Sequence, residues 1–229
     1  MCSPIDPKTV FVVIPAFNEH QSLQLVVDEL VDKHYNVVVV DDGSAMDLYP
    51  LLKNKPIFFL RHKVNLGQGA ALQTGIEFAL SRQPSYIVTF DADGQHNAND
   101  IEKMLLKLFE AKADIALGSR FIKNNPIPLK RKILLQAGRY INYLFTRLLL
   151  TDAHNGLRAM TKETAEKIRI RENRMAHATE ILSLIQKEKL KYIEVPVEVY
   201  YTEYSQRKGQ TAMSSFRIFF DLLLNKIFR

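Results

Sequence analysis

Short runs of apolar residues alternate, in the first half of the chain, with longer segments whose apolar positions recur every three or four residues. The runs predict buried strands, and the longer segments predict amphipathic helices. Strands are expected at 10–14, 36–40, 56–60, 86–90 and 115–117, and helices at 21–33, 69–81 and 98–112. Apolar strands that alternate with helices are typical of a parallel sheet covered on both faces. The pattern therefore predicts an α/β fold with a mostly parallel sheet flanked by helices.

The second half of the chain is less regular. Helices are expected at 130–150, 164–168, 178–187 and 214–228, a strand at 192–200 and a loop at 151–158. Pro196 lacks a backbone N–H, which indicates that its strand lies at the edge of the sheet. The segment 214–228 is very apolar and predicts a C-terminal amphipathic extension. Such a helix suits contact with a membrane, with a membrane protein or with a second copy of the chain.

Charge divides the chain into two unlike halves. Residues 1–100 carry seven Lys/Arg and twelve Asp/Glu, whereas residues 101–229 carry 24 and 13, so the net charge of +6 combines an acidic half with a basic one. Seven basic residues and no acidic one lie between Arg120 and Thr151. This segment favours an anionic partner, such as phosphate groups or an anionic membrane surface. A nucleic acid is not expected, because the basic residues do not interleave with aromatic ones.

The N-terminus and the hydropathy pattern bear on location. The single cysteine, Cys2, argues against an intramolecular disulfide and against a cysteine-based zinc site, and it fits a reducing compartment. The first nine residues have no basic segment before an apolar run, as a signal peptide would. No uncharged apolar run reaches the roughly 18 residues of a spanning helix. We expect a cytoplasmic protein that is peripherally associated with the inner face of a membrane.

Polar loops with acidic residues follow three of the predicted strands. They read Pro-Ala-Phe-Asn-Glu at 15–19, Asp-Asp-Gly-Ser at 41–44 and Asp-Ala-Asp-Gly-Gln-His at 91–96. Ligands of parallel α/β sheets bind beyond the carboxyl ends of the strands. The three loops are therefore expected to form one binding edge.

Asp91 and Asp93 are the strongest chemical feature of this edge. Two carboxylates two residues apart suit a hard divalent cation that is shared with phosphate groups. Gln95 could add a neutral oxygen ligand, and His96 is a weaker candidate. The same spacing also fits a solvated turn, because Asp and Gly are common turn residues.

The other loops are ambiguous by themselves. Asp42 could accept hydrogen bonds from a nucleobase or ribose, or it could cap a helix, and Asn18 and Glu19 leave the same two interpretations open. The glycine-containing loop around Gly69 opens a helix, which is a weak phosphate-binding signal. The loop lacks the Gly-Lys-Ser/Thr of a P-loop ATPase and the GxGxxG of a dinucleotide-binding enzyme, so both classes are disfavoured.

Five motifs in register carry a more specific signal. They are Val-Ile-Pro-Ala-Phe-Asn-Glu (13–19), Val-Val-Asp-Asp-Gly-Ser (39–44), Asn-Leu-Gly-Gln-Gly-Ala-Ala (65–71), Phe-Asp-Ala-Asp-Gly-Gln-His (90–96) and Gly-Ser-Arg (118–120). With them the chain resembles the family 2 glycosyltransferases of GT-A fold, and most of all their polyprenyl-phosphate branch, which includes the dolichyl-phosphate mannose synthases. The resemblance implies a GT-A (Rossmann-like) domain over 1–212, followed by an apolar helix at 213–229 without a transmembrane span.

The resemblance also divides the domain into a nucleotide-binding part at about 9–120 and an acceptor part at about 121–212. In the first part, the residues that would contact the donor substrate are Pro15, Ala16, Asn18, Glu19, Asp42, Gly69 and Asp91. The residues that match the family's metal-binding pattern for Mg²⁺ or Mn²⁺ are Asp91, Asp93 and Gln95.

In the second part, the resemblance places cations beside the phosphates. Arg120 matches an arginine that contacts donor and acceptor phosphate, and Arg207 or Lys208 would lie over the diphosphate. The residues that match a D-x-x-(N/S)-G-(F/L)-R element are Asp152, Asn155 and Arg158. Glu180 lies where the family has an acid. The catalytic set implied in this way is Asp93, Arg120, Glu180 and Arg207.

The function that these matches imply is metal-dependent transfer of a sugar from a UDP- or GDP-sugar to a polyprenyl (undecaprenyl or dolichyl) phosphate at a cytoplasmic membrane face. One alternative is transfer to a sugar hydroxyl in polysaccharide or glycolipid assembly, for which Glu180 or Asp152 would be the base. A second alternative is a non-catalytic module that binds nucleotide sugars. The chain has no tryptophan, so it lacks the Q-x-x-R-W motif of processive polysaccharide synthases.

Overall fold

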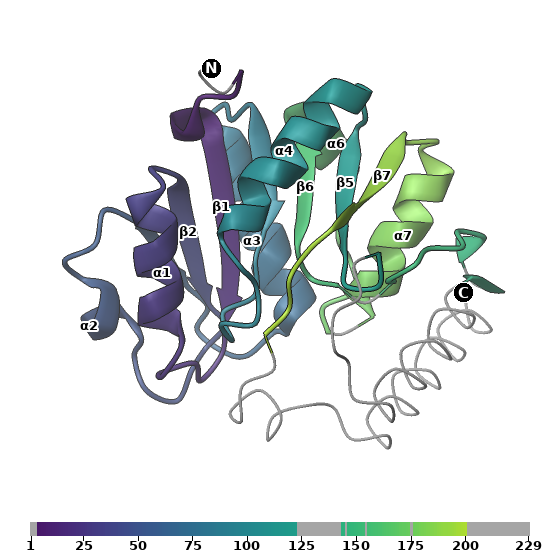
Figure 1. The fold of residues 1–229 in the computed structure, drawn as a ribbon. Coiled ribbons are helices and arrows are strands. Elements are labelled where there is room, and N and C mark those ends of the chain that lie inside the picture. The colour runs from purple at the N-terminus through teal and green to yellow at the C-terminus, as the bar shows by residue number, and fades with distance from the viewer. Residues whose placement is uncertain (1–3, 123–142, 145, 154, 175, 201–229) are drawn as a thin grey trace, which may run out of the picture.

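The computed structural model describes residues 4–122, 143–144, 146–153, 155–174 and 176–200 (Figure 1). In this part of the chain, seven strands form one sheet in the order β3-β2-β1-β4-β6-β5-β7. The strands are β1 (Val10–Ala16), β2 (Asn36–Asp41), β3 (Phe58–Arg61), β4 (Tyr86–Thr89), β5 (Ile115–Ser119), β6 (Arg158–Thr161) and β7 (Tyr192–Pro196). All neighbouring strands are parallel except β6, which runs antiparallel to β4 and β5. The predicted α/β fold with a mostly parallel sheet is confirmed.

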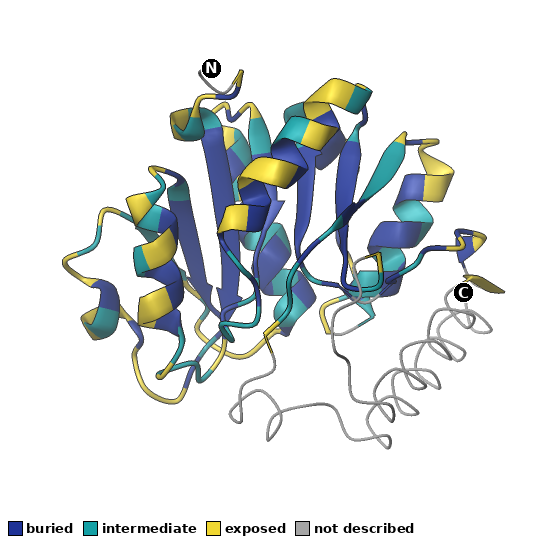
Figure 2. Cartoon of the chain, viewed as in Figure 1, coloured by how far each residue is buried: buried dark blue, intermediate teal, exposed yellow. Residues whose placement is uncertain are grey.

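Helices cover both faces of the sheet (Figure 1). One face packs against α1 (Leu23–Asp32) and α4 (Asn99–Ala111), and the other against α3 (Gln68–Ser81), α6 (Lys162–Lys167) and α7 (His177–Lys187). Strand β1 serves both cores, because successive side chains of a strand point to opposite faces: Val12 and Ile14 join the first core, and Phe11 and Val13 join the second. Figure 2 shows the buried strands between helices whose outer surfaces are exposed.

Three short elements were missed by the sequence prediction, and the first is the 3₁₀ turn η1 (Pro7–Thr9). Helix α2 (Tyr49–Leu52) has a single turn. Strand β6 begins at Arg158, the last residue of the predicted loop at 151–158. The strand expected at 192–200 ends at Pro196, and it lies at the edge of the sheet as the proline indicated. The proline costs no hydrogen bond with β5, because the next N–H, that of Val197, donates to the carbonyl of Ser119 at 3.0 Å.

The long helix expected at 130–150 is only partly within the described residues. Tyr143, Leu144 and Thr146 are helical, but residues 147–150 are not, and Arg147 has a φ of +60°. The left-handed conformation of Arg147 is incompatible with continuing an α-helix, so the prediction of helix up to residue 150 is wrong. The apolar segments 213–229 and 214–228 lie outside the described residues. Among the helices that are described, none is long and apolar enough to cross a membrane.

Candidate active site

The loops that follow β1, β2 and β4 are joined by hydrogen bonds at the carboxyl edge of the sheet. The backbone N–H of Asn18 donates to Ser44 Oγ at 2.8 Å, and Asn18 Oδ1 accepts from the N–H of Ala45 at 3.0 Å. Ser22 Oγ donates to the carbonyl of Ala92 at 2.7 Å. The predicted convergence of the three loops on one edge is confirmed. Asn18 has a φ of +56°, a conformation that asparagine tolerates better than most residues.

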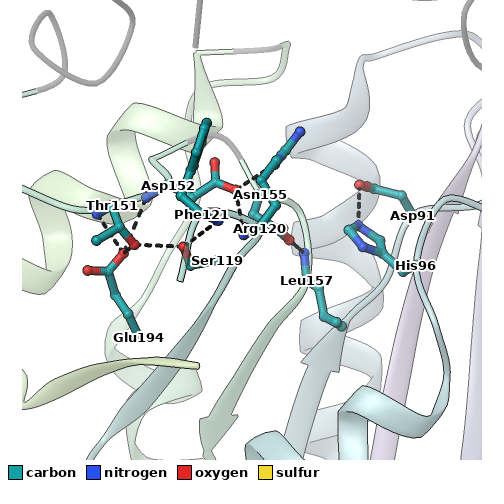
Figure 3. Close-up of polar contacts among 10 residues, drawn as sticks. All are labelled: Asp91, His96, Ser119, Arg120, Phe121, Thr151, Asp152, Asn155, Leu157 and Glu194. Carbon is teal, nitrogen blue, oxygen red and sulfur yellow. Dashed lines mark hydrogen bonds and ion pairs between the residues drawn. The ribbon is translucent and has the colours of Figure 1, made fainter. Parts of the chain in front are cut away.

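Asp91 is held from two sides. Gln68 Nε2 donates to its Oδ1 at 3.1 Å. On the other side, His96 Nε2 lies 3.1 Å from its Oδ2 (Figure 3). Burial raises the pKa of Asp91, but the hydrogen bond with His96 and the positive charges of His96 and Arg158 outweigh burial, so the pKa lies below its usual range. Asp91 is therefore an oriented, ionised carboxylate.

Gly156 makes room for this carboxylate. A Cβ atom at Gly156 would lie 2.7 Å from Asp91 Cγ and 2.8 Å from Oδ1, which is closer than non-bonded atoms approach each other. Any larger residue at position 156 would therefore clash with the Asp91 carboxylate. The carbonyl of Gly156 accepts a hydrogen bond from Thr89 Oγ1 at 2.7 Å, which fixes this backbone against the end of β4.

Asp93 differs from Asp91 in its environment. Burial raises the pKa of Asp93 above its usual range, and the negative charge of Asp91 adds to the effect. Asp93 accepts hydrogen bonds from the backbone N–H of Gln95 at 3.0 Å and from Gln95 Nε2 at 2.6 Å. A raised pKa beside a second carboxylate indicates a local excess of negative charge, which a bound cation would relieve.

The donor atoms fit a hard divalent cation. Asp91 and Asp93 offer carboxylate oxygens, and Gln95 uses its amide nitrogen on Asp93, which leaves Oε1 as its ligating atom. Mg²⁺ and Mn²⁺ prefer oxygen ligands of this kind. Among the described residues, no group of three His, Cys, Asp or Glu side chains could hold a metal ion. A cation at this site would therefore be completed by the amide oxygen, by water or by a phosphate.

The predicted donor-binding residues at β1 and β2 are buried or engaged. Pro15 and Ala16 lie in β1, paired with Val40 and Asp41 of β2. Asp42 is buried: its Oδ1 contacts His62 Nδ1 at 2.7 Å and its Oδ2 accepts from the N–H of Gly67 at 2.7 Å. Asp42 thus joins the loop after β2 to the loop before α3.

Glu19 lies beside Ser22, whose hydroxyl is 3.4 Å from its Oε2, at the start of α1. Its carboxylate is near enough to Asp93 for its charge to raise the pKa of Asp93 further. Glu19 is therefore part of the acidic edge. Whether Glu19 contacts ribose, as the motif implies, stays a prediction.

Gly69 has a packing role at the start of α3. Its N–H donates to the carbonyl of Asn173 at 2.8 Å, and the N–H of Ala70 reaches the same carbonyl at 3.3 Å. A Cβ at Gly69 would lie 2.8 Å from His177 Cβ. Two of the N–H groups that open α3 are thus bound within the chain, and a phosphate contact at Gly69 stays a prediction.

Glu180 lies in the first turn of α7 and binds backbone. Its carboxylate accepts from the N–H of Arg171 at 3.1 and 3.0 Å and from the N–H of Glu172 at 2.8 Å. Both carboxylate oxygens therefore have partners in the preceding segment of the chain.

Arg120 and Asp152 form a buried ion pair. Arg120 Nε donates to Asp152 Oδ2 at 2.5 Å, and the Arg120 backbone N–H donates to the same oxygen at 3.2 Å. The two side chains are 7% and 1% exposed. The two residues are thus in direct contact, as Figure 3 shows, and their roles beside the phosphates stay a prediction.

A hydrogen-bond network anchors this pair to the sheet. Glu194 Oε1 accepts from the N–H and the hydroxyl of Thr151, at 2.7 and 2.6 Å, and from the N–H of Asp152 at 3.3 Å. Thr151 Oγ1 is 2.6 Å from Ser119 Oγ. Residues of β5 and β7 thus fix the loop that carries Asp152. Sequence reasoning missed Glu194, although a lone acid within an otherwise apolar edge strand was a visible signal.

Arg158 and His177 are buried and close enough for their charges to act on Asp91. Arg158 is 3% exposed and feels the charges of both Asp91 and Asp152, although burial lowers the pKa of its guanidinium. Burial, followed by the positive charge of Arg158, lowers the pKa of His177 to about 4. The imidazole is thus neutral, and its Nδ1 lies 2.7 Å from the carbonyl of Arg174.

Asn155 supplies an unpaired donor. Its Oδ1 accepts from the N–H of Leu157 at 2.9 Å, whereas its buried Nδ2 has no hydrogen-bond partner among the described residues. His96 Nδ1 is likewise buried and unpartnered in this part of the chain. Buried polar atoms without partners are costly and cluster at functional sites.

The chain returns to the acidic loop just before the described residues end. The backbone of Val199 forms a bridge with His96, and the N–H of Tyr200 donates to the carbonyl of Gln95 at 2.8 Å. Arg207 and Lys208 lie outside the described residues. The segment that leads to them therefore starts beside Gln95.

Comparison with known proteins gives one family. The sequence matches the family described as Glycosyl transferase family 2 over residues 11–169. The chain is 39% identical over 230 residues to an uncharacterized protein of Methanocaldococcus jannaschii, covering 98% of this chain and 95% of that protein. It is 33% identical to the UDP-N-acetylglucosamine–dolichyl-phosphate N-acetylglucosaminyltransferase of Methanococcus voltae, covering 96% and 97% of the two chains.

Solved structures share the fold. Glucosyl-3-phosphoglycerate synthase from Mycobacterium tuberculosis, in complex with Mn²⁺, uridine diphosphate and glucosyl-3-phosphoglycerate, superposes with a TM-score of 0.61 at 16% identity. The match covers 88% of this chain and 75% of that one.

Proposed function

Since the chain belongs to glycosyl transferase family 2, we propose that it transfers a sugar from a nucleoside diphosphate sugar to a polyprenyl phosphate at the cytoplasmic face of a membrane. The enzyme class follows from the family. The acceptor is the proposal, and it is supported by the Methanococcus voltae relative, whose name gives dolichyl phosphate as acceptor. UDP-N-acetylglucosamine is the first donor to test for the same reason.

The observation that carries the proposal is the arrangement of charge at the carboxyl edge. Asp91 and Asp93 lie on one side, and the Arg120–Asp152 pair lies on the other, with the buried Arg158 close enough for its charge to act on Asp91 and on Asp152. Acids that hold a cation and arginines that bind phosphate are what two phosphorylated substrates require.

The chain's own residues would orient the donor and stabilise the leaving group. A divalent cation held by Asp91, Asp93 and Gln95 would neutralise the diphosphate as it departs from the anomeric carbon. Gln68 and His96 fix the direction of the Asp91 carboxylate. Preorganised charges of this kind lower the barrier because they need no rearrangement during the reaction.

The acceptor phosphate needs cations more than it needs a base. A phosphate monoester is an anion at neutral pH, so its oxygen can attack without losing a proton to the protein. Arg120 is held by Asp152 at the same edge, and its guanidinium would let two phosphates approach each other. Arg207 or Lys208, on the segment that starts beside Gln95, would contribute a further positive charge.

A sugar hydroxyl acceptor is the alternative, and it would need a general base. The two candidates are Glu180, whose carboxylate is bound to the backbone of Arg171 and Glu172, and Asp152, which is paired with Arg120. Neither is an uncommitted carboxylate, which favours the phosphate acceptor. A binding module without activity would keep nucleotide affinity and show no turnover.

Association with a membrane is part of the proposal. The basic segment between Arg120 and Thr151 and the apolar segment 214–228 supply the positive charge and the apolar surface that interfacial binding needs. A lipid phosphate presents its head group at that interface.

The purified chain should be incubated with UDP- and GDP-sugars, short polyprenyl phosphates and Mg²⁺ or Mn²⁺, and the product identified by mass. A glycosyl-phosphoprenol is expected. Products made only on saccharide acceptors would contradict the proposal, and so would tight nucleotide binding without any product.

Asp93→Asn tests the metal site in the same assay. We expect it to lose transfer and metal-dependent nucleotide binding while the melting temperature stays near that of the wild type. Asp32→Asn is the matched control, because Asp32 is an exposed aspartate at the end of α1. Equal activity of Asp93→Asn and Asp32→Asn would refute the assignment of Asp93.

A further inference from the structure

The segment 171–173, which precedes α7 in the chain, is hydrogen-bonded both to α7 and to the first turn of α3. On one side it is bound by Glu180 of α7, which accepts the backbone N–H groups of Arg171 and Glu172. On the other side, the carbonyl of Asn173 accepts the N–H groups of Gly69 and Ala70. The N–H groups of α3 therefore donate to the segment, and the N–H groups of the segment donate to the Glu180 carboxylate.

The contact is close enough that two glycines are needed. A Cβ at Gly67 would lie 2.8 Å from the carbonyl carbon of Asn173, and a Cβ at Gly69 would lie 3.1 Å from the carbonyl carbon of Glu172, with the carbonyl oxygens closer still. Gly67 also has a φ of +105°, which is unfavourable for other residues. The glycines therefore let the backbone of 172–173 lie directly against the turn.

Gln68 lies between these two glycines. Its Nε2 donates to Asp91 Oδ1 at 3.1 Å, so the position of the turn sets the direction of the Asp91 carboxylate. The turn is also bound by Asp42, which accepts the N–H groups of Leu66 and Gly67 at 3.0 and 2.7 Å. The hydrogen bonds of the 171–173 segment to Gly69, Ala70 and Glu180 are called the clamp below.

We propose that Glu180 is a positioning residue, which fixes the 171–173 segment over the first turn of α3 and thereby holds Gln68 against Asp91. This rests on the proposed function only in so far as Asp91 acts at the reaction centre. It gives Glu180 a role other than that of the base required by a hydroxyl acceptor. A carboxylate suits the role because it is the side chain that can accept several backbone N–H bonds at once.

Hydrogen exchange of the unligated chain tests the clamp without any substrate. In Glu180→Ala, the amides of Gly69 and Ala70 should exchange with solvent roughly fivefold faster or more. Loss of one contact of ordinary hydrogen-bond strength produces a change of this size. Glu188→Ala is the matched control, because Glu188 is an exposed glutamate at the other end of α7. Unchanged exchange of both amides in Glu180→Ala would overturn the proposal, whatever reaction the chain catalyses.

Kinetics separates positioning from base catalysis. Glu180→Gln keeps an oxygen that accepts a backbone N–H, so we expect it to retain turnover within roughly tenfold, with the shape of the pH–rate profile unchanged, whereas loss of a general base costs roughly 100- to 10,000-fold. Glu180→Ala and Gln68→Ala should each lower turnover or metal affinity by roughly 10- to 100-fold. A base-like loss in Glu180→Gln, with an altered pH profile, would contradict positioning.

The double variant shows whether Glu180 acts through Gln68. If it does, Glu180→Ala/Gln68→Ala loses no more than the worse of the two single variants, because the second change removes an interaction already lost. Losses that multiply would overturn the proposed connection. If the wild type itself shows no turnover and no metal-dependent nucleotide binding, the proposed function fails, and the exchange experiment still decides the clamp.

Discussion

Gly156→Ala adds one methyl group at the back of the Asp91 carboxylate. The added Cβ would lie 2.7 Å from Asp91 Cγ and 2.8 Å from Oδ1. Asp91 Oδ2 would lie closer still. Because carbon atoms keep about 3.5 Å from non-bonded neighbours, the carboxylate has to retreat by about 1 Å or more. That movement strains or breaks the hydrogen bonds to Gln68 and His96, both of which are 3.1 Å long.

The expected cost is small for the fold and large for the reaction. The atoms that must move belong to a short side chain at the rim of the sheet, so the free energy of unfolding should fall by about 1–3 kcal/mol, as in other overpacked sites. A misplacement near 1 Å in a catalytic group costs on the order of 100-fold in rate. We therefore expect turnover with saturating donor and metal to fall about 100-fold while the protein remains folded.

Urea denaturation and steady-state transfer kinetics measure the two effects separately. Gly75→Ala is the control, because its Cβ would clash with Val13 in the core between α3 and β1, away from the acidic loop. It should lose at least as much stability and keep turnover per folded molecule. If Gly156→Ala is as active as the wild type, Asp91 does not act from the position it has in this structure.

Two further predictions concern buried charge. Arg120→Ala or Asp152→Ala should each lower the free energy of unfolding by about 3–5 kcal/mol, because the remaining charge stays buried without its counter-charge, and Arg120→Met/Asp152→Leu should lose less; urea denaturation decides, and single losses below about 1 kcal/mol would contradict a buried pair. Burial, and then the charge of Arg158, lowers the pKa of His177 from 6.5 to about 4, so the unfolded chain takes up a proton at a higher pH than the folded chain. The stability due to neutral His177 is complete above pH 6.5 and is lost as the pH falls towards 4, by up to about 3 kcal/mol. His177→Gln, which can still donate to the carbonyl of Arg174, should remove this part of the pH dependence, and identical pH dependence in both proteins would refute it.

The parallel part of the fold could be predicted because its signals are local. Runs such as Val37–Val40 are apolar throughout, and α1 and α4 have one apolar face each, so period and length identify them. The loops at the strand ends follow from the same pattern, since parallel strands bring their carboxyl ends to one edge. The convergence of Asn18, Ser44 and Ala92 needed no further information.

The parts that escaped prediction depend on contacts distant in sequence. Strand β6 has four residues and is defined by pairing with β4 and β5, which no local pattern of Arg-Ala-Met-Thr reveals. Glu180 looks like any glutamate on a helix until its backbone partners are seen. Gln68 and His177 were missed for the same reason, because their roles come from the atoms they meet and not from their spacing.

The placement of β6 between β4 and β5 has a consequence for how the chain folds during synthesis. Strand β5 pairs only with β6 and β7 among the described strands, so when it leaves the ribosome its partners have not yet been made. Until residue 161 appears, β4 is an open sheet edge, available for pairing with other chains. Long-range pairing of this kind is slow. Asp91 and Gly156 come together at the same moment, so nascent chains that stop earlier are exposed to aggregation and lack the complete candidate site.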